Sequence, residues 1–136
     1  MIYYAVIDTN VIVSSMLSGA SIPGIIVSKA LSGPIIPLLN DEILNEYKDV
    51  LLRNKFDLDE EAVLELIEEL KKRAIYLDRT ETTEVFNDPD DIVFYEIVMT
   101  ARNDSEAYLI TGNKKHFPAK SFVVTPREML DIIGED

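Results

Sequence analysis

The chain has 136 residues, of which 13 are Lys or Arg and 25 are Asp or Glu, so its formal net charge is -12 at pH 7. This length suits one domain with a continuous core, and a single domain over residues 1–136 is expected. The acidic balance repels a polyanion at long range, which disfavours a stable nonspecific nucleic-acid binder and suits divalent cations or basic proteins as ligands. Cysteine is absent, and no apolar run reaches the roughly 20 residues that cross a bilayer. We therefore expect a cytoplasmic protein that spans no membrane.

The pattern of apolar and polar residues alternates between strands and helices along the whole chain. In chain order it predicts a strand at residues 3–7, helices at 11–17 and 21–31, a strand at 35–38, helices at 40 to about 53 and at 59–73, a strand at 74–77, a helix at 89 to about 102, strands at 107–110 and 122–124, and a last helix after residue 125. Strands alternating with helices of this length predict a parallel sheet covered on both faces.

Asp8 is the first candidate site residue. It is the only charged residue among the first 28, and it follows the strand at residues 3–7 directly. In parallel α/β sheets, ligands bind beyond the carboxyl ends of the strands, near the point where the strand order reverses. The alternative is that Asp8 or Thr9 caps the following helix by accepting backbone N–H bonds, and one residue can serve both purposes.

Glu46 is the second candidate. On a helical wheel it lies between Ile43 and Val50, at the margin of the buried stripe, whereas Lys48 lies at the other margin. Periodicity alone also allows an ordinary solvated glutamate here.

The segment Asp88-Pro89-Asp90-Asp91 places three carboxylates at the start of a buried helix. Its structural interpretation is a helix start, with Asp88 as the cap and two acids in the first turn, each stabilising by about 0.3 to 1 kcal/mol. Three acids exceed what one helix end requires, and a cation would relieve the repulsion between them. At least one of them is therefore a candidate ligand.

The turn Thr111-Gly112-Asn113 follows a strand and also reaches the carboxyl edge of the sheet, although a simple turn needs no function. Lys114 and the neighbouring lysine are candidates for contacting substrate phosphates, with simple solvation as the alternative. His116 is the only histidine and has no partner with zinc-ligand spacing, so no zinc site is expected.

Four motifs in this order resemble the PIN-domain family: V-I-D-T-N at 6–10, N-E-Y at 45–47, D-P-D-D-x-x-F at 88–94 and L-I-T-G-N at 109–113. The resemblance covers nearly the whole chain. The segment V-T-P-R-E-M-L at 124–130 is similar to the branch of VapC-like ribonucleases, the toxin components of toxin–antitoxin systems. The resemblance implies a single PIN-like domain, folded as a three-layer α/β/α sandwich with a five-stranded parallel sheet.

The family uses acids at the strand edge to bind Mg²⁺ or Mn²⁺, which by resemblance assigns ligand and catalytic roles to Asp8, Glu46 and one aspartate of the third motif. Asp91 is preferred because apolar residues follow it at three and seven positions, as in the family, and Asp90 is the alternative. Where the family has a fourth acid this chain has Asn113, which adds no charge, so a second metal should bind more weakly.

The resemblance implies an endoribonuclease that hydrolyses RNA phosphodiester bonds and expels the 3′ oxygen, with Asn10 and Thr111 orienting a carboxylate or a water. It also implies a toxin whose acidic surface binds an antitoxin protein, and a homodimer as one expected assembly. One alternative is a PIN-like module that binds RNA or protein without cutting, because the fourth acid is missing. Another is a phosphotransfer enzyme of the haloacid-dehalogenase type, which would need an aspartate where Asn10 stands.

Overall fold

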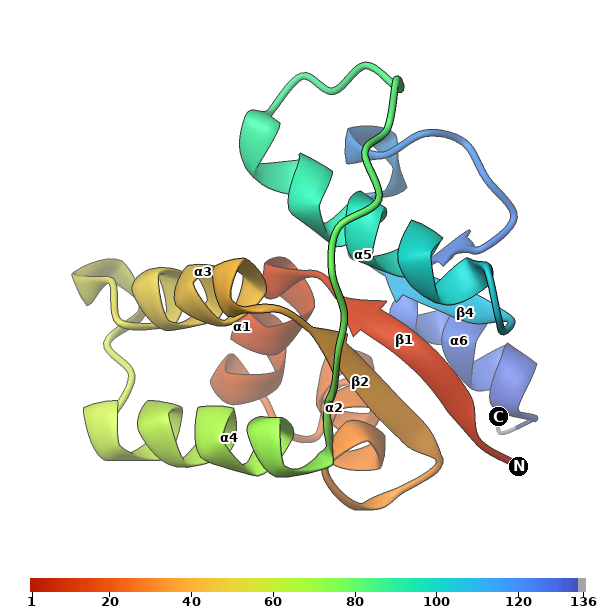
Figure 1. The fold of residues 1–136 in the computed structure, drawn as a ribbon. Coiled ribbons are helices and arrows are strands. Elements are labelled where there is room, and N and C mark those ends of the chain that lie inside the picture. Colours follow the sequence, from red (N-terminus) through yellow and green to blue (C-terminus); the bar gives the residue numbers. More distant parts are fainter. Residues whose placement is uncertain (135–136) are drawn as a thin grey trace.

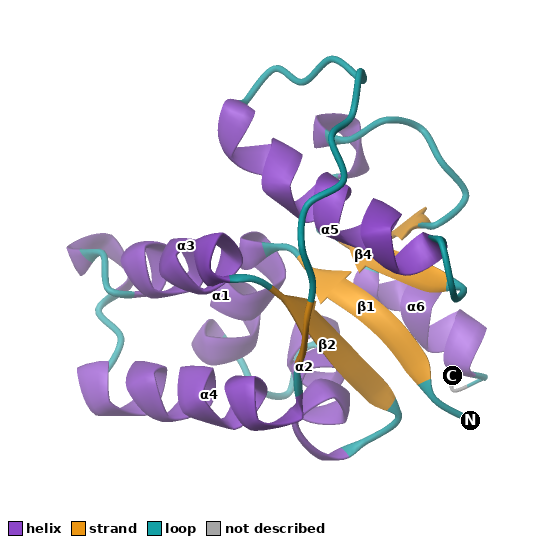
Figure 2. Ribbon diagram, in the orientation of Figure 1, coloured by secondary structure: helices purple, strands orange, loops and turns teal. Residues whose placement is uncertain are grey.

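The computed structural model describes residues 1–134 and forms one five-stranded sheet with helices on both faces (Figure 1, Figure 2). The elements in chain order are β1 (Tyr3–Ile7), α1 (Thr9–Leu17), α2 (Ile22–Ser32), β2 (Ile35–Leu39), α3 (Asp41–Leu51), η1 (Asn54–Phe56), α4 (Glu60–Arg73), β3 (Ile75–Tyr76), η2 (Pro89–Asp91), α5 (Ile92–Arg102), β4 (Ala107–Ile110), η3 (Lys114–His116), β5 (Val123–Val124) and α6 (Pro126–Ile133). The last two residues of the predicted domain, 135–136, lie outside the described part.

The sheet has the order β3-β2-β1-β4-β5, and all neighbouring strands are parallel. Helix α5 packs against β1, β2 and β4 on one face, while α2 packs against β2 on the other face and contacts α4 and α6 (Figure 2). The predicted three-layer α/β/α sandwich with a five-stranded parallel sheet is therefore confirmed.

Several predicted boundaries were wrong, each for a local reason. α1 begins at Thr9 and not at residue 11, because the Asp8 carboxylate caps its first backbone N–H. The helix predicted from residue 89 begins with a 3-10 turn, η2, in which Asp88 accepts a hydrogen bond from the Asp90 N–H, and α5 follows from Ile92. The strands β3 and β5 contain only two residues each, because only two residues of β3 pair with β2 and only two of β5 pair with β4.

The connection from β3 to η2 crosses the outer side of α5, as the green segment in Figure 1 shows. Arg79 holds it in place by binding Glu96 of α5 at 2.6 Å and Glu42 of α3 at 2.7 Å. Glu96 is the buried acid of this otherwise apolar helix face, and it also accepts from the Thr82 N–H at 2.8 Å. These ties fix where the chain delivers the aspartates at the start of α5.

Among the described residues, no single helix is long and apolar enough to cross a membrane. Taken together, α1 and α2 would be long and apolar enough, but the two helices are bent by 104° at their junction. Both contribute residues to the buried core, among them Ile12 and Ile26.

Tyr47 joins α3 to the end of β1. Its side chain is 1% exposed, its ring lies against Phe94 with the ring centroids 6.4 Å apart, and its hydroxyl donates a hydrogen bond to the Ile7 carbonyl. Because Ile7 precedes Asp8 and Glu46 precedes Tyr47, this contact sets the position of one candidate residue relative to the other.

Replacing Tyr47 with Phe should lower the free energy of unfolding by about 1 to 2 kcal/mol, since the Ile7 carbonyl loses a buried donor. Urea denaturation followed by circular dichroism measures this loss. Tyr76→Phe, at a half-exposed tyrosine of β3, is the control and should leave the midpoint unchanged. Equal midpoints for both variants would show that the Tyr47 hydroxyl contributes nothing.

Candidate active site

Asp8 stands at the carboxyl end of β1, the central strand of the sheet. From β1 the strand order runs through β2 and β3 to one edge, and through β4 and β5 to the other edge. This is the switch point at which parallel α/β sheets bind ligands. The side chain is buried, with 6% of the residue exposed. Its Oδ1 accepts from the Thr9 N–H at 2.8 Å and its Oδ2 accepts from the Thr111 hydroxyl at 2.7 Å. Asp8 therefore both caps α1 and lies at the sheet edge, and its burial raises the pKa of the carboxyl despite these two donors.

The turn after β4 is tied to the start of α1 by side-chain hydrogen bonds. Thr111 is fully buried, and its hydroxyl also accepts from the Asn113 N–H at 3.0 Å. Asn10 accepts from the Gly112 N–H at 3.1 Å. Thr111 thus contacts a carboxylate, as predicted for an orienting residue, whereas Asn10 holds the backbone of the turn.

Asp91 lies within electrostatic reach of Asp8. Its side chain is 16% exposed, and burial together with the charges of Asp8 and Asp88 raises the pKa of Asp91 to about 6. Asp90 is exposed, and Asp88 serves as the cap of η2. The choice of Asp91 over Asp90 as the metal ligand stays a prediction.

Glu46 faces the same region from α3. It is half-buried, while Lys48 at the opposite margin of the helix is exposed. Burial raises the pKa of Glu46, as do the charges of Asp90 and, more weakly, Asp8. The structure therefore brings Glu46 to the side where the aspartates gather, with Asp90 as the aspartate that acts on it most strongly.

The candidate acids interact electrostatically but do not form a preformed metal site. Within residues 1–134, no group of three His, Cys, Asp or Glu side chains is arranged to hold a metal ion. Yet Asp8 raises the pKa of both Asp91 and Glu46, so the carboxylates lie within electrostatic reach of one another. Mg²⁺ keeps several waters and commonly uses only one or two carboxylates. The donor set fits a hydrated hard cation better than a closed protein cage.

A family model described as "PIN domain" matches residues 4–115. The chain belongs to the PIN-domain family. PIN domains are generally nucleases and typically use divalent metals, and the matched segment contains Asp8, Glu46 and Asp91. Comparison with curated proteins and with solved structures found no match.

One residue beside this PIN-domain site was missed by the sequence analysis, which considered His116 only as a zinc ligand. His116 lies in η3, and its Nδ1 is 3.8 Å from Asp91 Oδ2. Its Nε2 is 3.1 Å from the amino group of Asn113, the N-cap of η3. The signal in the sequence was the spacing of three residues between Asn113 and His116, which brings the two side chains together in a single helical turn.

Two other candidate residues are already engaged in contacts. Lys114 binds Glu128 of α6, with Nζ at 3.0 Å and 3.2 Å from the two carboxylate oxygens. The Asn113 side-chain oxygen accepts from the Lys115 N–H at 3.3 Å. Neither side chain points freely to a substrate or a second metal in this conformation of the PIN domain.

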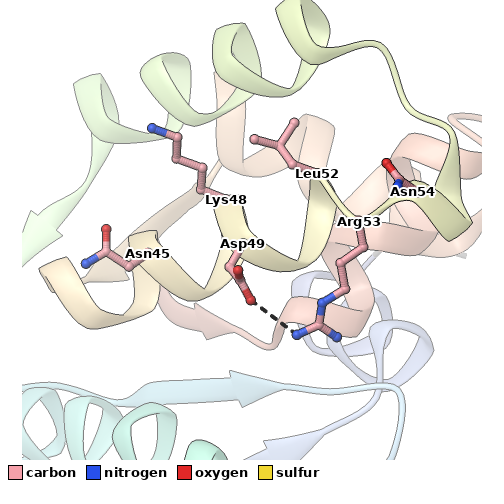
Figure 3. Close-up of a pocket in the computed structure, with 6 residues that line it drawn as sticks. All are labelled: Asn45, Lys48, Asp49, Leu52, Arg53 and Asn54. Atoms are coloured by element: carbon pink, nitrogen blue, oxygen red, sulfur yellow. Dashed lines mark hydrogen bonds and ion pairs between the residues drawn. The ribbon is translucent and has the colours of Figure 1, made fainter.

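A surface cavity of about 530 Å³ runs along α3 and the turn that follows it (Figure 3). It is lined by Asn45, Lys48, Asp49, Leu52, Arg53 and Asn54. The figure shows the Arg53 guanidinium turned toward Asp49, which it binds at 3.2 Å. None of the candidate acids lines this cavity, so it is separate from the carboxylate site of the PIN domain. Arg53 nevertheless lies near enough to Glu46 to lower the pKa of that carboxyl.

Proposed function

We propose that this protein is a metal-dependent endoribonuclease that hydrolyses RNA phosphodiester bonds with Mg²⁺ or Mn²⁺. The observation that carries the proposal is the position of Asp8 at the switch point of the sheet in a PIN domain, with Asp91 and Glu46, from two other elements, within its electrostatic reach. The negative charge of Asp8 raises the pKa of both Asp91 and Glu46. Groups arranged in this way bind a cation more readily than isolated carboxylates, because the cation relieves their repulsion.

In this proposal Asp8 and Asp91 hold the cation, with Glu46 or Asp90 completing the site directly or through water. A bound divalent cation would supply positive charge to the phosphate oxygens and would make a water molecule more acidic. The Thr111 hydroxyl keeps the Asp8 carboxylate in one rotation, and the Tyr47 hydroxyl keeps α3 at the end of β1. These contacts reduce the reorganisation that the acids need when substrate binds.

We further propose that the nuclease is the toxin of a toxin–antitoxin pair, acts in the cytoplasm and forms a homodimer. The net charge of -12 favours a basic antitoxin segment as the partner that covers the acidic surface. The motif at 124–130 gives the toxin branch less support once the structure is considered. Thr125 and Glu128 of this motif form the capping box of α6. That contact gives part of the motif a local structural purpose.

The test is RNA cleavage by the purified protein with Mn²⁺, with Mg²⁺ or with EDTA. Cleavage should require the metal, and Glu46→Gln should reduce kcat/KM by about tenfold or more, as expected for a ligand or an outer-shell acid. Glu65→Gln makes the same change at an exposed position of α4 and serves as the control. Cleavage that persists in EDTA would contradict the metal-dependent mechanism.

The second candidate function is a PIN-like module that binds RNA or a protein without cutting. Asn113 in place of a fourth acid favours it, as does the finding that no preformed three-ligand group exists in the described residues. The two functions differ in one measurement. If the natural chain binds RNA without cleaving it, and Asn113→Asp creates metal-dependent cleavage, the binding module is correct.

A further inference from the structure

His116 extends from η3 toward the acidic site. Its Nδ1 faces Asp91 Oδ2 at 3.8 Å, and the side chain is 52% exposed, so a ligand can reach it from solvent. The charge of the protonated ring also lowers the pKa values of Asp8 and Asp91. The imidazole therefore lies beside the Asp91 carboxylate and within electrostatic reach of Asp8.

Asn113 determines which nitrogen of the neutral ring carries the proton. The side-chain oxygen of Asn113 accepts from the Lys115 N–H at 3.3 Å, which identifies the other end of the amide as the amino group. That amino group lies 3.1 Å from His116 Nε2. An amide NH₂ only donates, so Nε2 accepts the hydrogen bond and the proton resides on Nδ1.

The Nδ1–H donor faces the Asp91 carboxylate but does not form a hydrogen bond with it. A separation of 3.8 Å is longer than a hydrogen bond. We propose that His116 binds the phosphate of the RNA substrate by donating a hydrogen bond from Nδ1–H to a phosphate oxygen, with Asn113 as the positioning residue that fixes the tautomer. This inference rests on the proposed nuclease function and names a substrate contact within the same site.

The exchange of a fourth acid for Asn113 then has a chemical consequence. A carboxylate at this position would accept from Nε2–H, leaving a lone pair on Nδ1 to face Asp91 and to repel a phosphate oxygen. The amide gives the opposite polarity and adds no negative charge. In a chain of net charge -12, a donor beside the aspartates offsets part of the repulsion that an incoming phosphate meets.

Lysine side chains surround η3, and positive charge of this kind suits a phosphate-bearing ligand. Lys115 lies next to His116 in the chain, and a cavity of about 330 Å³ beside this turn is lined by Lys114, Lys115 and Lys120 among others. Lys114 and Lys120 bind Glu128 and Glu84. The turn thus places the charge of Lys115 next to the His116 donor, where the flanking backbone of a single strand can be held.

Binding of a short single-stranded RNA tests the contact without cleavage. Asp8→Asn serves as the parent, because it removes a proposed ligand and so prevents turnover. Adding His116→Ala to this parent should raise the Kd about tenfold or more, as expected for the loss of a hydrogen bond to a charged group. Adding Lys72→Ala instead, at a paired lysine of α4 that lines no part of this cavity, should leave the Kd unchanged.

Equal affinities of the parent and the His116→Ala double variant would overturn the inference while leaving the nuclease proposal intact. Failure of both wild type and parent to bind RNA would overturn the nuclease proposal itself, and the His116 contact with it. In the metal-loaded wild-type background, His116→Ala should raise KM more than it lowers kcat, because the contact binds the phosphate before and during the reaction.

The tautomer is measurable because His116 is the only histidine in the chain. In ¹⁵N NMR at mildly alkaline pH, the wild-type ring should show Nδ1 protonated and Nε2 as the unprotonated nitrogen. Asn113→Asp should move the proton to Nε2, and Asn113→Ala should give a mixture of both forms. A wild-type ring with its proton on Nε2 would overturn the positioning role of Asn113, whatever the RNA affinity.

Discussion

Asp8→Asn should abolish the metal-dependent cleavage of RNA while leaving the protein folded. Loss of one cation ligand removes several kcal/mol of transition-state stabilisation, so we expect kcat/KM to fall by about a hundredfold or more. The unfolding free energy should change by no more than about 1 kcal/mol, because Asn also caps helices and the burial cost of a charge disappears. Cleavage assays with Mn²⁺ and urea denaturation measure the two quantities on the same preparation.

Asp59→Asn is the matched control for this variant. Asp59 is the N-cap of α4 and accepts from the Ala62 N–H at 3.0 Å, so it shares the capping role of Asp8 but is exposed and belongs to another element. The control should retain full activity. If Asp8→Asn is as active as Asp59→Asn, Asp8 acts only as a helix cap and the proposed site is wrong.

The sequence predicted the part of this site that depends on strand ends. Asp8 and Thr111 follow apolar strands directly, and parallel strands bring their carboxyl ends to one edge, so their meeting follows from pattern alone. The contact between the Thr111 hydroxyl and the Asp8 carboxylate bears this out. The same holds for the fold class, because the alternation of strands and helices allows few arrangements other than a covered parallel sheet.

The relative positions of the acids were not predictable from the pattern. The approach of Asp91 to Asp8 depends on the path of the connection after β3, which Arg79 holds through Glu42 and Glu96. Such long-range ion pairs leave no periodic signal in the sequence. Periodicity placed both Glu46 and Lys48 at margins of the buried stripe of α3. Their burial differs, because neighbouring elements cover the margin of Glu46 and leave that of Lys48 exposed.

The contact of His116 with the site was hidden for a different reason. Its side chain is directed by the 3-10 turn η3 and by the amide of Asn113, and short turns of this kind are not resolved by apolar periodicity. Zinc-ligand spacing also concerns only Cys and other His residues near His116 in the sequence. The relevant neighbour, Asp91, comes from a different element.

Asp91→Asn should make the metal-free protein more stable near neutral pH. The folded state raises the pKa of Asp91 to about 6 from the ordinary value of 3.8, so between these values the folded state binds more protons than the unfolded state. The favourable contribution of the neutral carboxyl is complete below pH 3.8 and is lost as the pH rises through about 6. Solvent screening and the favourable dipole at the start of α5 reduce the effect, and we expect a gain of about 1 to 2 kcal/mol at about pH 7.

Urea denaturation in EDTA at about pH 7 and at about pH 4 measures this gain, which should shrink at the lower pH because the wild-type carboxyl becomes protonated there. Asp78→Asn, at an exposed aspartate of the connection after β3, is the control and should show no such difference. Adding Mn²⁺ should stabilise the wild type more than Asp91→Asn, since a cation bound only by the folded state shifts the unfolding equilibrium. A variant that is less stable than wild type at neutral pH would mean that Asp91 serves the start of α5 and not a charged site. A stability gain in Asp91→Asn that Mn²⁺ reverses would show that this carboxylate costs the metal-free protein stability, as our proposal of Asp91 as a cation ligand predicts.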